Sequence, residues 1–327
     1  MSSTEWTIYH LVPNRAKYPG WDAYLYYLAR MIELSGDSVS ILSGASFLAP
    51  EGSPAIITGV VPHMIPDLTR VPDWIPIVAH SVAHARAIYS SGTITPRPII
   101  AATDAIAREV MRLGDDPEIT RCPIPYVRQL IPDHEKETVE HRAVFMGRLH
   151  VSKGLTEALQ VNHLLDPDQN IAFYGKRNDS YSSPLGAMGR WKEWDHGPYL
   201  AGEGPSVASK GECILYLSDP LEGNRANVPY VALEAWDAGV PVIAWSRNCQ
   251  GREGQLLAGL NCIGVDDPMD LACFLHHEGD LSELARQRET VAAGEDELSF
   301  HCDPALVLGR MRQAMRLPQS GRLHFRP

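Results

Sequence analysis

The chain has few cysteines, and they are not grouped. Six occur among 327 residues, and no two of them form a C-x-x-C pair, which counts against a zinc ribbon or a redox dithiol. The sequence instead predicts buried free thiols in a reducing, cytoplasmic compartment. These cysteines are Cys122, Cys213, Cys249, Cys262, Cys273 and Cys302.

Long apolar runs and an excess of basic residues are also lacking. No uninterrupted apolar stretch approaches the roughly 18–20 residues that a membrane span needs. The first six residues show no basic segment followed by an apolar one, so a secretory signal is not expected. The net charge of −11 counts against a general polyanion binder, although it leaves room for a local basic groove. With 44% hydrophobic residues the chain is not disordered, and its length suggests two domains.

Short apolar runs and amphipathic stretches alternate along the first part of the chain. Residues 7–11 are typical of a strand, and apolar residues within 21–32 recur with the spacing of one helix face. A second strand at 38–42 completes a βαβ unit, which implies a parallel sheet. The same alternation predicts strands at 75–79 and 98–102 and helices at 81–89 and 104–113.

The alternation restarts after a stretch rich in proline and acidic residues that ends near residue 140. Two such series predict an α/β chain of two doubly wound, Rossmann-like domains that face each other across a cleft. We assign residues 1–140 to the first domain and residues 141–304 to the second. In the second domain the sequence predicts strands at 143–146, 171–174, 213–217 and 241–245, and helices at 154–165 and 228–238.

A strand that ends in Gly147-Arg148, with Lys153 just before the next helix, carries the clearest chemical signal. Ligands in such folds bind at the carboxyl ends of the strands. An arginine there can grip a diphosphate with two hydrogen bonds, a lysine adds a point charge, and a helix N-terminus attracts anions. Two solvated cations beside a turn would show the same spacing, and the pattern alone does not separate the two interpretations.

A second segment combines a helix start with an acidic residue inside the helix. Asn227 is a suitable N-cap for a helix that starts at Val228, and Gly239 is placed to end it. Glu234 lies about two turns after Asn227 on the same face, so its carboxylate could accept hydrogen bonds from a ribose diol. The alternative for Glu234 is an ordinary exposed helix residue. Its apolar neighbours favour burial, and a buried carboxylate requires a partner.

The order of these motifs resembles the nucleotide-sugar domain of family-4 retaining glycosyltransferases. The similarity extends from about Ala143 to Leu275, whereas the N-terminal half resembles the family only in outline. It rests on Gly147-Arg148-Leu149, Lys153-Gly154, Glu222-Gly223, Leu233-Glu234-Ala235 and Gly239-Val240-Pro241-Val242-Ile243-Ala244. The family has the GT-B architecture of two Rossmann-like domains, and its last helix commonly returns to the first domain. The resemblance therefore implies that residues 305–327 pack back on residues 1–140.

The resemblance implies a role for each matching residue. Arg148 and Lys153 would bind the donor diphosphate and stabilise the leaving group, and Glu234 would hold the ribose hydroxyls. Glu222 would contact the transferred sugar and act in catalysis, although the interval between Glu222 and Glu234 is longer here than in the family. The other donor-binding candidates in this domain are Gly147, Asn227 and Val228.

Two residues of the first domain join these candidates. Gly20 lies in a short glycine loop, where backbone amides could approach a phosphate. His80 follows a predicted strand, and in the family a histidine at the corresponding place contacts the donor sugar. His80 and His84 share a helical face, but no third ligand lies nearby in the sequence to complete a metal site.

The sequence thus predicts a cytoplasmic glycosyltransferase that transfers a sugar, with retention, from a nucleoside diphosphate sugar to an acceptor hydroxyl. A UDP-sugar is the expected donor. Neither a metal nor another cofactor is expected, because Arg148 and Lys153 would supply the positive charge. The acceptor stays open between a small molecule or glycan and DNA. A phage-type DNA glucosyltransferase acting on a hydroxymethylated base is one alternative, and a GT-B-like nucleotide-sugar epimerase is another.

Overall fold

In the computed structural model, the chain divides into two compact units. Unit 1 comprises Met1–Val127 and Phe300–Pro327, and unit 2 comprises Arg128–Ser299. The first unit therefore ends at Val127 rather than at residue 140. The structure describes residues 4–11, 19–43, 52–59, 72, 74–79, 82–90, 98–114, 117–129, 139–166, 169–176, 191–218, 228–249, 256–276 and 281–315.

Unit 1 is built on a six-stranded sheet in which every neighbouring pair of strands is parallel. The strand order is β2-β1-β3-β4-β5-β6, so the order reverses at β1. The strands are β1 (Glu5–His10), β2 (Ser38–Ser43), β3 (Ala55–Thr58), β4 (Ile77–Ala79), β5 (Ile99–Ala101) and β6 (Ile119–Arg121). Strand β3, which sequence periodicity did not predict, pairs with β1 from Thr7 to His10.

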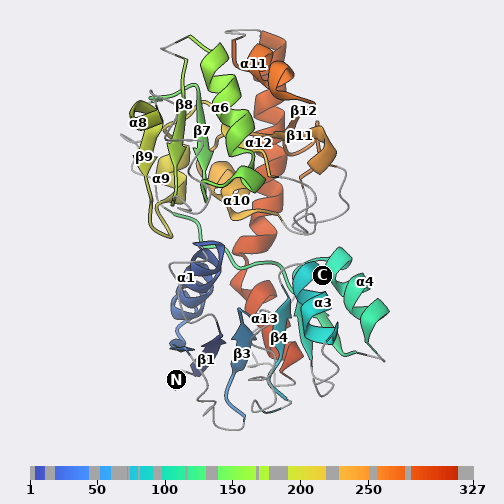
Figure 1. Ribbon diagram of the computed structural model, residues 1–327. Coiled ribbons are helices and arrows are strands. Elements are labelled where there is room, and N and C mark those ends of the chain that lie inside the picture. Colours follow the sequence, from blue (N-terminus) through green and yellow to red (C-terminus); the bar gives the residue numbers. More distant parts are fainter. Residues whose placement is uncertain are drawn as a thin grey trace. The chain divides into compact units, whose positions relative to one another are not determined.

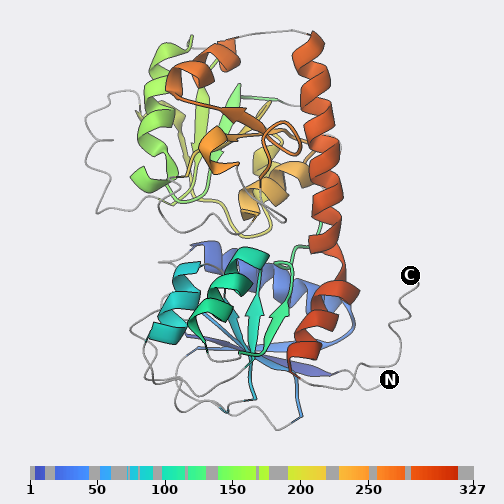
Figure 2. The ribbon, with the colours of Figure 1, turned by 90° about the vertical axis from the view of Figure 1, so that its right-hand side faces the viewer.

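Two pairs of helices cover the two faces of this sheet. Helix α1 (Pro19–Leu34) contacts α13 (Pro304–Ala314), and α3 (Val82–Ser90) contacts α4 (Asp104–Leu113). Right-handed crossovers place α1 on the opposite face from α3 and α4, because the strand order reverses between them. Figure 2 shows α13 and the pair α3 and α4 on opposite sides of the sheet.

The C-terminal return to unit 1 is fixed by contacts with the first strands. Arg312 of α13 pairs with Asp37 at 2.6 Å, and its guanidinium lies over the ring of Trp6. The backbone amide of Ala55 donates to the sulfur of Met315. Helix α13 thus completes the core of unit 1 with residues from the far end of the chain.

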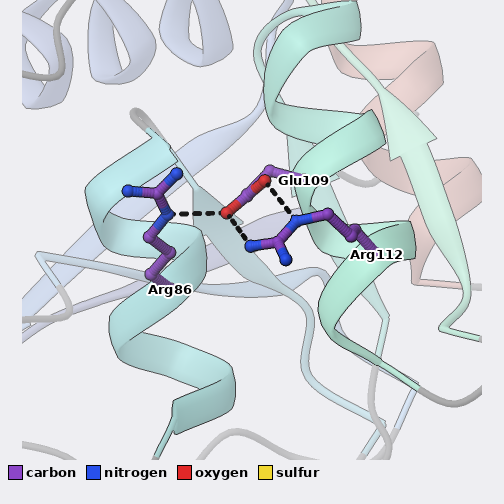
Figure 3. A network of polar contacts seen from close by, with 3 residues as sticks. All are labelled: Arg86, Glu109 and Arg112. Atoms are coloured by element: carbon purple, nitrogen blue, oxygen red, sulfur yellow. Dashed lines mark hydrogen bonds and ion pairs between the residues drawn. The ribbon is translucent and has the colours of Figure 1, made fainter.

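A small ionic network joins the two helices on the other face (Figure 3). The carboxylate of Glu109 on α4 accepts hydrogen bonds from Arg86 on α3 and from Arg112 one turn further along α4. These hydrogen bonds hold the pKa of Glu109 down, at about 2. The network therefore links α3 to α4 through one ionised carboxylate.

Unit 2 also contains six strands, each parallel to its neighbours (Figure 1). The order β9-β8-β7-β10-β11-β12 is third-second-first-fourth-fifth-sixth along the chain, which is the order of dinucleotide-binding domains. The strands are β7 (Ala143–Met146), β8 (Ile171–Tyr174), β9 (Asp195–Gly197), β10 (Ile214–Tyr216), β11 (Val242–Trp245) and β12 (Ile263–Val265).

The helices of unit 2 pack on both faces of its sheet. One apolar cluster includes Phe145, Phe173, Leu215 and Ile243 from the strands, together with side chains of α6 and α11. Helices α10 and α9 contact each other, and α12 reaches α10 where Gly294 meets the indole of Trp236. The helices are α6 (Leu155–Leu164), α8 (Trp191–Trp194), α9 (Gly204–Ala208), α10 (Tyr230–Asp237), α11 (Pro268–His276) and α12 (Leu281–Cys302), and the short 3-10 helices are η3 (Val151–Lys153) and η6 (Ser246–Asn248).

Among the described residues, no helix is both long enough and apolar enough to cross a membrane. Four of the six cysteines are buried free thiols, as the sequence predicted, but Cys273 is exposed and Cys302 is partly exposed.

Candidate functional site: the carboxyl edge of the unit 2 sheet

The strand order of unit 2 marks one place at the carboxyl edge of its sheet. The order reverses between β7 and β10, so the loops that leave these two strands run in opposite directions. Ligands of open α/β sheets bind in the crevice at such a reversal. Gly147-Arg148 leave β7, and Leu217-Ser218 leave β10. The candidate phosphate residues predicted from the sequence therefore lie at the reversal point.

Glycines allow the loops at this edge to approach one another closely. Gly154 has a φ of 80°, and a Cβ added there would collide with the backbone of Leu217. The amide of Gly147 donates to the carbonyl of Tyr174 at 3.0 Å, and a Cβ on Gly175 would collide with the Gly147 carbonyl. The loops after β7, β8 and β10 are therefore joined through backbone, with little side-chain bulk between them.

Three cations are placed along this edge by the chain. Arg148 follows β7 directly, and Lys153 ends the 3-10 helix η3 immediately before Gly154. Both side chains are partly buried. Lys176, which sequence analysis missed, follows β8 as Arg148 follows β7, and the amide of Leu149 donates to its carbonyl at 3.1 Å. The repeated pattern of strand, glycine and cation in Met146-Gly147-Arg148 and Tyr174-Gly175-Lys176 could have revealed it.

The start of α10 lies beside these cations and differs from the sequence prediction. The N-cap is Pro229 rather than Asn227, and the helix starts at Tyr230. Proline has no side-chain acceptor, so the first turn receives no side-chain cap. The nearest side-chain atom to a Cβ built on Gly147 belongs to Val231, in this first turn. The side chain of Val228 is buried, so only its backbone could face a ligand.

Glu234 is buried, which rules out the alternative of an exposed helix residue. Glu234 is only 2% exposed. A Cβ added to Gly204 would collide with the carboxyl group of Glu234. Burial, and then the charge of Glu234, raise the pKa of Tyr199 well above its usual value. Glu234 thus faces the segment between β9 and α9, and sequence analysis identified neither Gly204 nor Tyr199.

Helix α10 is fixed at its far end as the sequence predicted. Gly239 has a φ of 71°, its amide donates to the carbonyl of Trp236, and the amide of Val240 donates to the carbonyl of Ala235. This pair of bonds is a Schellman motif. It fixes the end of the helix that carries Glu234, so the carboxylate is held from a rigid element.

Unit 1 has its own reversal point, which carries different chemistry. The order reverses at β1, where His10 and Thr58 end the neighbouring strands β1 and β3. Their Nδ1 and Oγ1 atoms lie 3.0 Å apart, and both residues are fully buried. Gly20 does not lie in a loop: it belongs to the first turn of α1. Sequence analysis did not single out His10 or Thr58.

Three predicted site residues lie outside the described residues: His80, Glu222 and Asn227. Within the described ranges, no three His, Cys, Asp or Glu side chains are grouped as a metal site would require. Of the predicted site residues, the structure therefore places Gly147, Arg148 and Lys153 at one edge of unit 2. Gly154 lies against Leu217 there, and Gly147 lies near Val231 of α10, the helix that carries Glu234.

This arrangement suits a ligand that is anionic at one end. Arginine and lysine beside an uncapped helix start attract phosphate oxygens, because the charges and the amide dipoles act in the same direction. The glycine contacts leave backbone rather than side chains at the edge. A buried carboxylate on α10 can accept hydrogen bonds from hydroxyl groups.

With its two six-stranded parallel sheets and flanking helices, the chain has the GT-B fold of two Rossmann-like domains. No protein-family model and no curated protein matches the sequence. Among solved structures, HepE of Anabaena in complex with UDP aligns over 96% of this chain and 100% of its own, with a TM-score of 0.64 and 11% identity.

Two further solved structures share the fold. The DNA-modifying enzyme beta-glucosyltransferase aligns over 96% of this chain and 100% of its own, with a TM-score of 0.59 and 13% identity. TarM of S. aureus aligns over 80% of this chain and 55% of its own, with a TM-score of 0.56 and 11% identity. At such low identities the likeness concerns the fold.

Proposed function

We propose that this protein is a glycosyltransferase that transfers a sugar from a nucleoside diphosphate sugar, with UDP as the expected nucleotide, to an acceptor hydroxyl. The observation that carries the proposal is the position of Arg148 and Lys153 at the strand-order reversal of unit 2. Their chain neighbours Gly147 and Gly154 lie against Val231 of α10 and against Leu217. HepE, which shares the fold, has been solved with UDP-glucose. The proposal gives unit 2 the donor and unit 1 the acceptor.

In this proposal the charge of the site acts on the leaving group. When the bond between sugar and diphosphate breaks, negative charge grows on the diphosphate oxygen. Arg148, Lys153 and the first turn of α10 would stabilise that charge, so no metal and no other cofactor is required. Glu234 would bind the ribose hydroxyls, and Glu222 the sugar. Retention of the anomeric configuration is part of the proposal and follows from the resemblance to family-4 enzymes.

The experiment is a thermal-shift panel of UDP-, GDP- and ADP-sugars on wild type and on Arg148→Ala. A ligand at about 100 times its Kd stabilises the folded protein by about 2.7 kcal/mol. We expect a UDP-sugar to raise the Tm of the wild type and to raise that of Arg148→Ala much less. Equal shifts in both proteins would remove Arg148 from the site. Transfer of labelled sugar in the presence of EDTA then tests metal independence, and loss of transfer restored by Mg²⁺ or Mn²⁺ would contradict it.

The acceptor has two candidates. A small molecule or glycan is favoured by the net charge of −11, which opposes binding to the DNA backbone. A hydroxymethylated base in DNA is favoured by the end-to-end similarity to the DNA-modifying beta-glucosyltransferase. Binding of the protein to DNA that contains the modified base, strong at low salt and lost as the salt concentration rises, would support DNA as the acceptor. A product in which the sugar stays on the nucleotide with altered configuration would instead indicate an epimerase.

A further inference from the structure

Two buried cysteines meet in unit 2, although no two cysteines of the chain form a C-x-x-C pair. The Sγ atoms of Cys249 and Cys262 lie 3.4 Å apart, and the Cys249 thiol also lies 3.3 Å from the carbonyl of Trp245. Cys249 is 7% exposed and Cys262 is fully buried. Both are buried free thiols, as the sequence predicted, and the fold brings these residues, 13 positions apart in the sequence, into contact.

The surroundings of the pair suit formation of a disulfide. A disulfide has an S–S length of about 2.05 Å, so the sulfurs need to approach by roughly 1.4 Å. Cys249 follows the 3-10 helix η6, and Cys262 directly precedes β12, with one isolated bridge to Ala258. The Cys262 carbonyl accepts from the amide of Gly259. Neither cysteine lies in the middle of a strand, where the hydrogen bonds of the sheet would resist such a shift more strongly.

The thiols also differ in acidity. The hydrogen bond from Cys262 lowers the pKa of Cys249, and the same contact raises the pKa of Cys262. Burial instead raises the pKa of Cys122 and of Cys213 to about 12. Since the thiolate is the reactive form, Cys249 is favoured as the attacking thiol over these two buried cysteines.

The chain neighbours of the pair hold two elements of the candidate site. Asn248, next to Cys249, donates from Nδ2 to the carbonyl of Ser218 at 2.5 Å, in the loop that leaves β10. Asn261, next to Cys262, accepts a hydrogen bond from Nε1 of Trp236 on α10, the helix that carries Glu234. A movement of the two cysteines would therefore reach both the β10 loop and α10.

We propose that Cys249 and Cys262 form a peroxide-reactive dithiol that closes to a disulfide and weakens binding at the adjacent site. The Cys249 thiolate attacks one oxygen of hydrogen peroxide, which breaks the O–O bond, forms a sulfenic acid and releases hydroxide. The Cys262 sulfur, after losing its proton, then attacks the Cys249 sulfur and displaces hydroxide. With two protons taken up, two waters leave, the pair is oxidised by two electrons, and the peroxide is reduced. A thiol reductant reverses the change.

The effect on the site rests on the proposed function, whereas the disulfide does not. The full-length protein is treated with hydrogen peroxide, its remaining thiols are alkylated under denaturing conditions, and it is digested with trypsin. Arg252 lies between the two cysteines in the sequence, so trypsin separates Cys249 from the peptide of residues 253–286, which carries both Cys262 and Cys273. A linked peptide in which Cys273 is alkylated, and which persists in Cys273→Ser, shows the Cys249–Cys262 disulfide. We expect this peptide in the wild type, its loss on treatment with dithiothreitol, and UDP binding that is about fivefold or more weaker in the oxidised protein.

Matched variants separate the pair from other thiols. Cys249→Ser and Cys262→Ser should yield no linked peptide and UDP affinity that peroxide does not change, and Cys273→Ser, at the exposed cysteine, should behave as the wild type. If both thiols of the wild type stay fully alkylatable at a peroxide dose that oxidises Cys273, the dithiol is wrong, whether or not the serine variants fold. A linked peptide with unchanged UDP affinity would overturn the effect on the site. Absence of UDP binding in the reduced protein counts against the proposed function, and the linked peptide still decides the dithiol.

Discussion

The two sheets of the molecule share an architecture and differ at the point where the strand order reverses. Each has six strands, all parallel to their neighbours. In unit 1 the reversal carries His10 and Thr58, which are fully buried and hydrogen-bonded to each other. In unit 2 it carries Gly147 and Arg148, with Gly154 against the backbone of Leu217. At the reversal point, the same topology therefore holds a buried polar pair in one unit and a cation with close-packed backbone in the other.

The proposed function relates this difference to a division of roles between the units. A diphosphate needs cations, backbone amides and the absence of side-chain bulk, which the reversal point of unit 2 offers. In unit 1 the side chains at the reversal point, His10 and Thr58, are fully buried and bonded to each other, and neither is a lysine or an arginine. Ligands of open α/β sheets bind at such reversal points, and the residues there decide what the ligand is.

Removal of Arg148 or of Lys153 should have the largest effect on activity. We expect Arg148→Ala and Lys153→Ala each to reduce transition-state stabilisation by about 2–4 kcal/mol, since each would remove a group aimed at a developing charge. The loss should affect kcat as well as KM, because the charge on the leaving oxygen is larger in the transition state than in the bound donor. Steady-state kinetics on the folded variants measures both.

Two further variants sharpen this expectation. Arg148→Lys should restore activity only in part, because lysine cannot make the planar bidentate contact. The double alanine variant should lose less than the sum of the single losses, since the two cations act on one group. Near-wild-type kinetics in either single variant would mean that the residue is a solvated surface cation, and the contrast between the units would lose its main support.

Loss of the Glu234 carboxylate should have the next largest effect. Glu234→Ala removes a buried charged acceptor, and we expect donor use to fall by about 1.5–3 kcal/mol. Glu222→Ala should cost less, because the interval that separates the two acids is longer than in the family that the chain resembles. The comparison is made on kcat/KM for the donor, with Glu109→Ala in unit 1 as a control that should leave it unchanged. Equal losses for Glu234→Ala and Glu222→Ala would contradict the ranking.

The sequence was most informative where strand, glycine and cation follow one another. Strands at 143–146 and 171–174 were predicted with their observed bounds, because continuous apolar runs end at glycine. The cap of α10 was wrong: Asn227 is the better capping residue by side-chain chemistry, but the helix starts after Pro229. The partners of Glu234 were missed because contact with Gly204 and Tyr199 comes from packing between segments distant in the sequence.

The missed elements share a physical cause. Strands β6 and β9 lack a continuous apolar run, since they read Ile-Thr-Arg and Asp-His-Gly. Strands β4 and β5 are equally short but are apolar throughout, and they were predicted. Helix α12 has 22 residues but many charged ones, so its apolar positions are diluted. Short or polar elements are stabilised here by pairing with a neighbouring strand or by packing, which local sequence does not record.

The His10–Thr58 pair of unit 1 tests the same comparison, with a smaller expected effect. Thr58→Val removes the hydroxyl group that lies 3.0 Å from Nδ1 of His10 and keeps the shape of the side chain. We expect a loss of about 1 kcal/mol in the free energy of unfolding, and no change in UDP affinity. Thr58→Ser, which keeps the hydroxyl, should be closer to the wild type. A clear fall in UDP affinity for Thr58→Val would show that unit 1 contributes to the donor site.

The smallest effect is expected at the Glu109 network of unit 1, which is remote from both reversal points in the sequence. Glu109 is well covered, with 12% of its side chain exposed, but Arg86 and Arg112 are largely exposed and screened by solvent. Glu109→Gln should therefore lower Tm at pH 7 by only about 1–3 °C. Glu33→Gln, in the exposed pair with Arg30, is the matched control and should change Tm less.

The pH dependence distinguishes an ionic contribution from a packing contribution. The pKa of Glu109 is lowered from 4.5 to about 2 in the folded protein. The folded state thus favours the ionised form, and the stabilisation is complete above the unfolded-state pKa. It is lost as the pH falls from about 4.5 through about 2, so the difference in Tm between wild type and Glu109→Gln should shrink across that window. A difference that stays constant from pH 7 to pH 3 would mean that Glu109 acts by packing between α3 and α4, and a difference that shrinks would assign its effect to the two arginines.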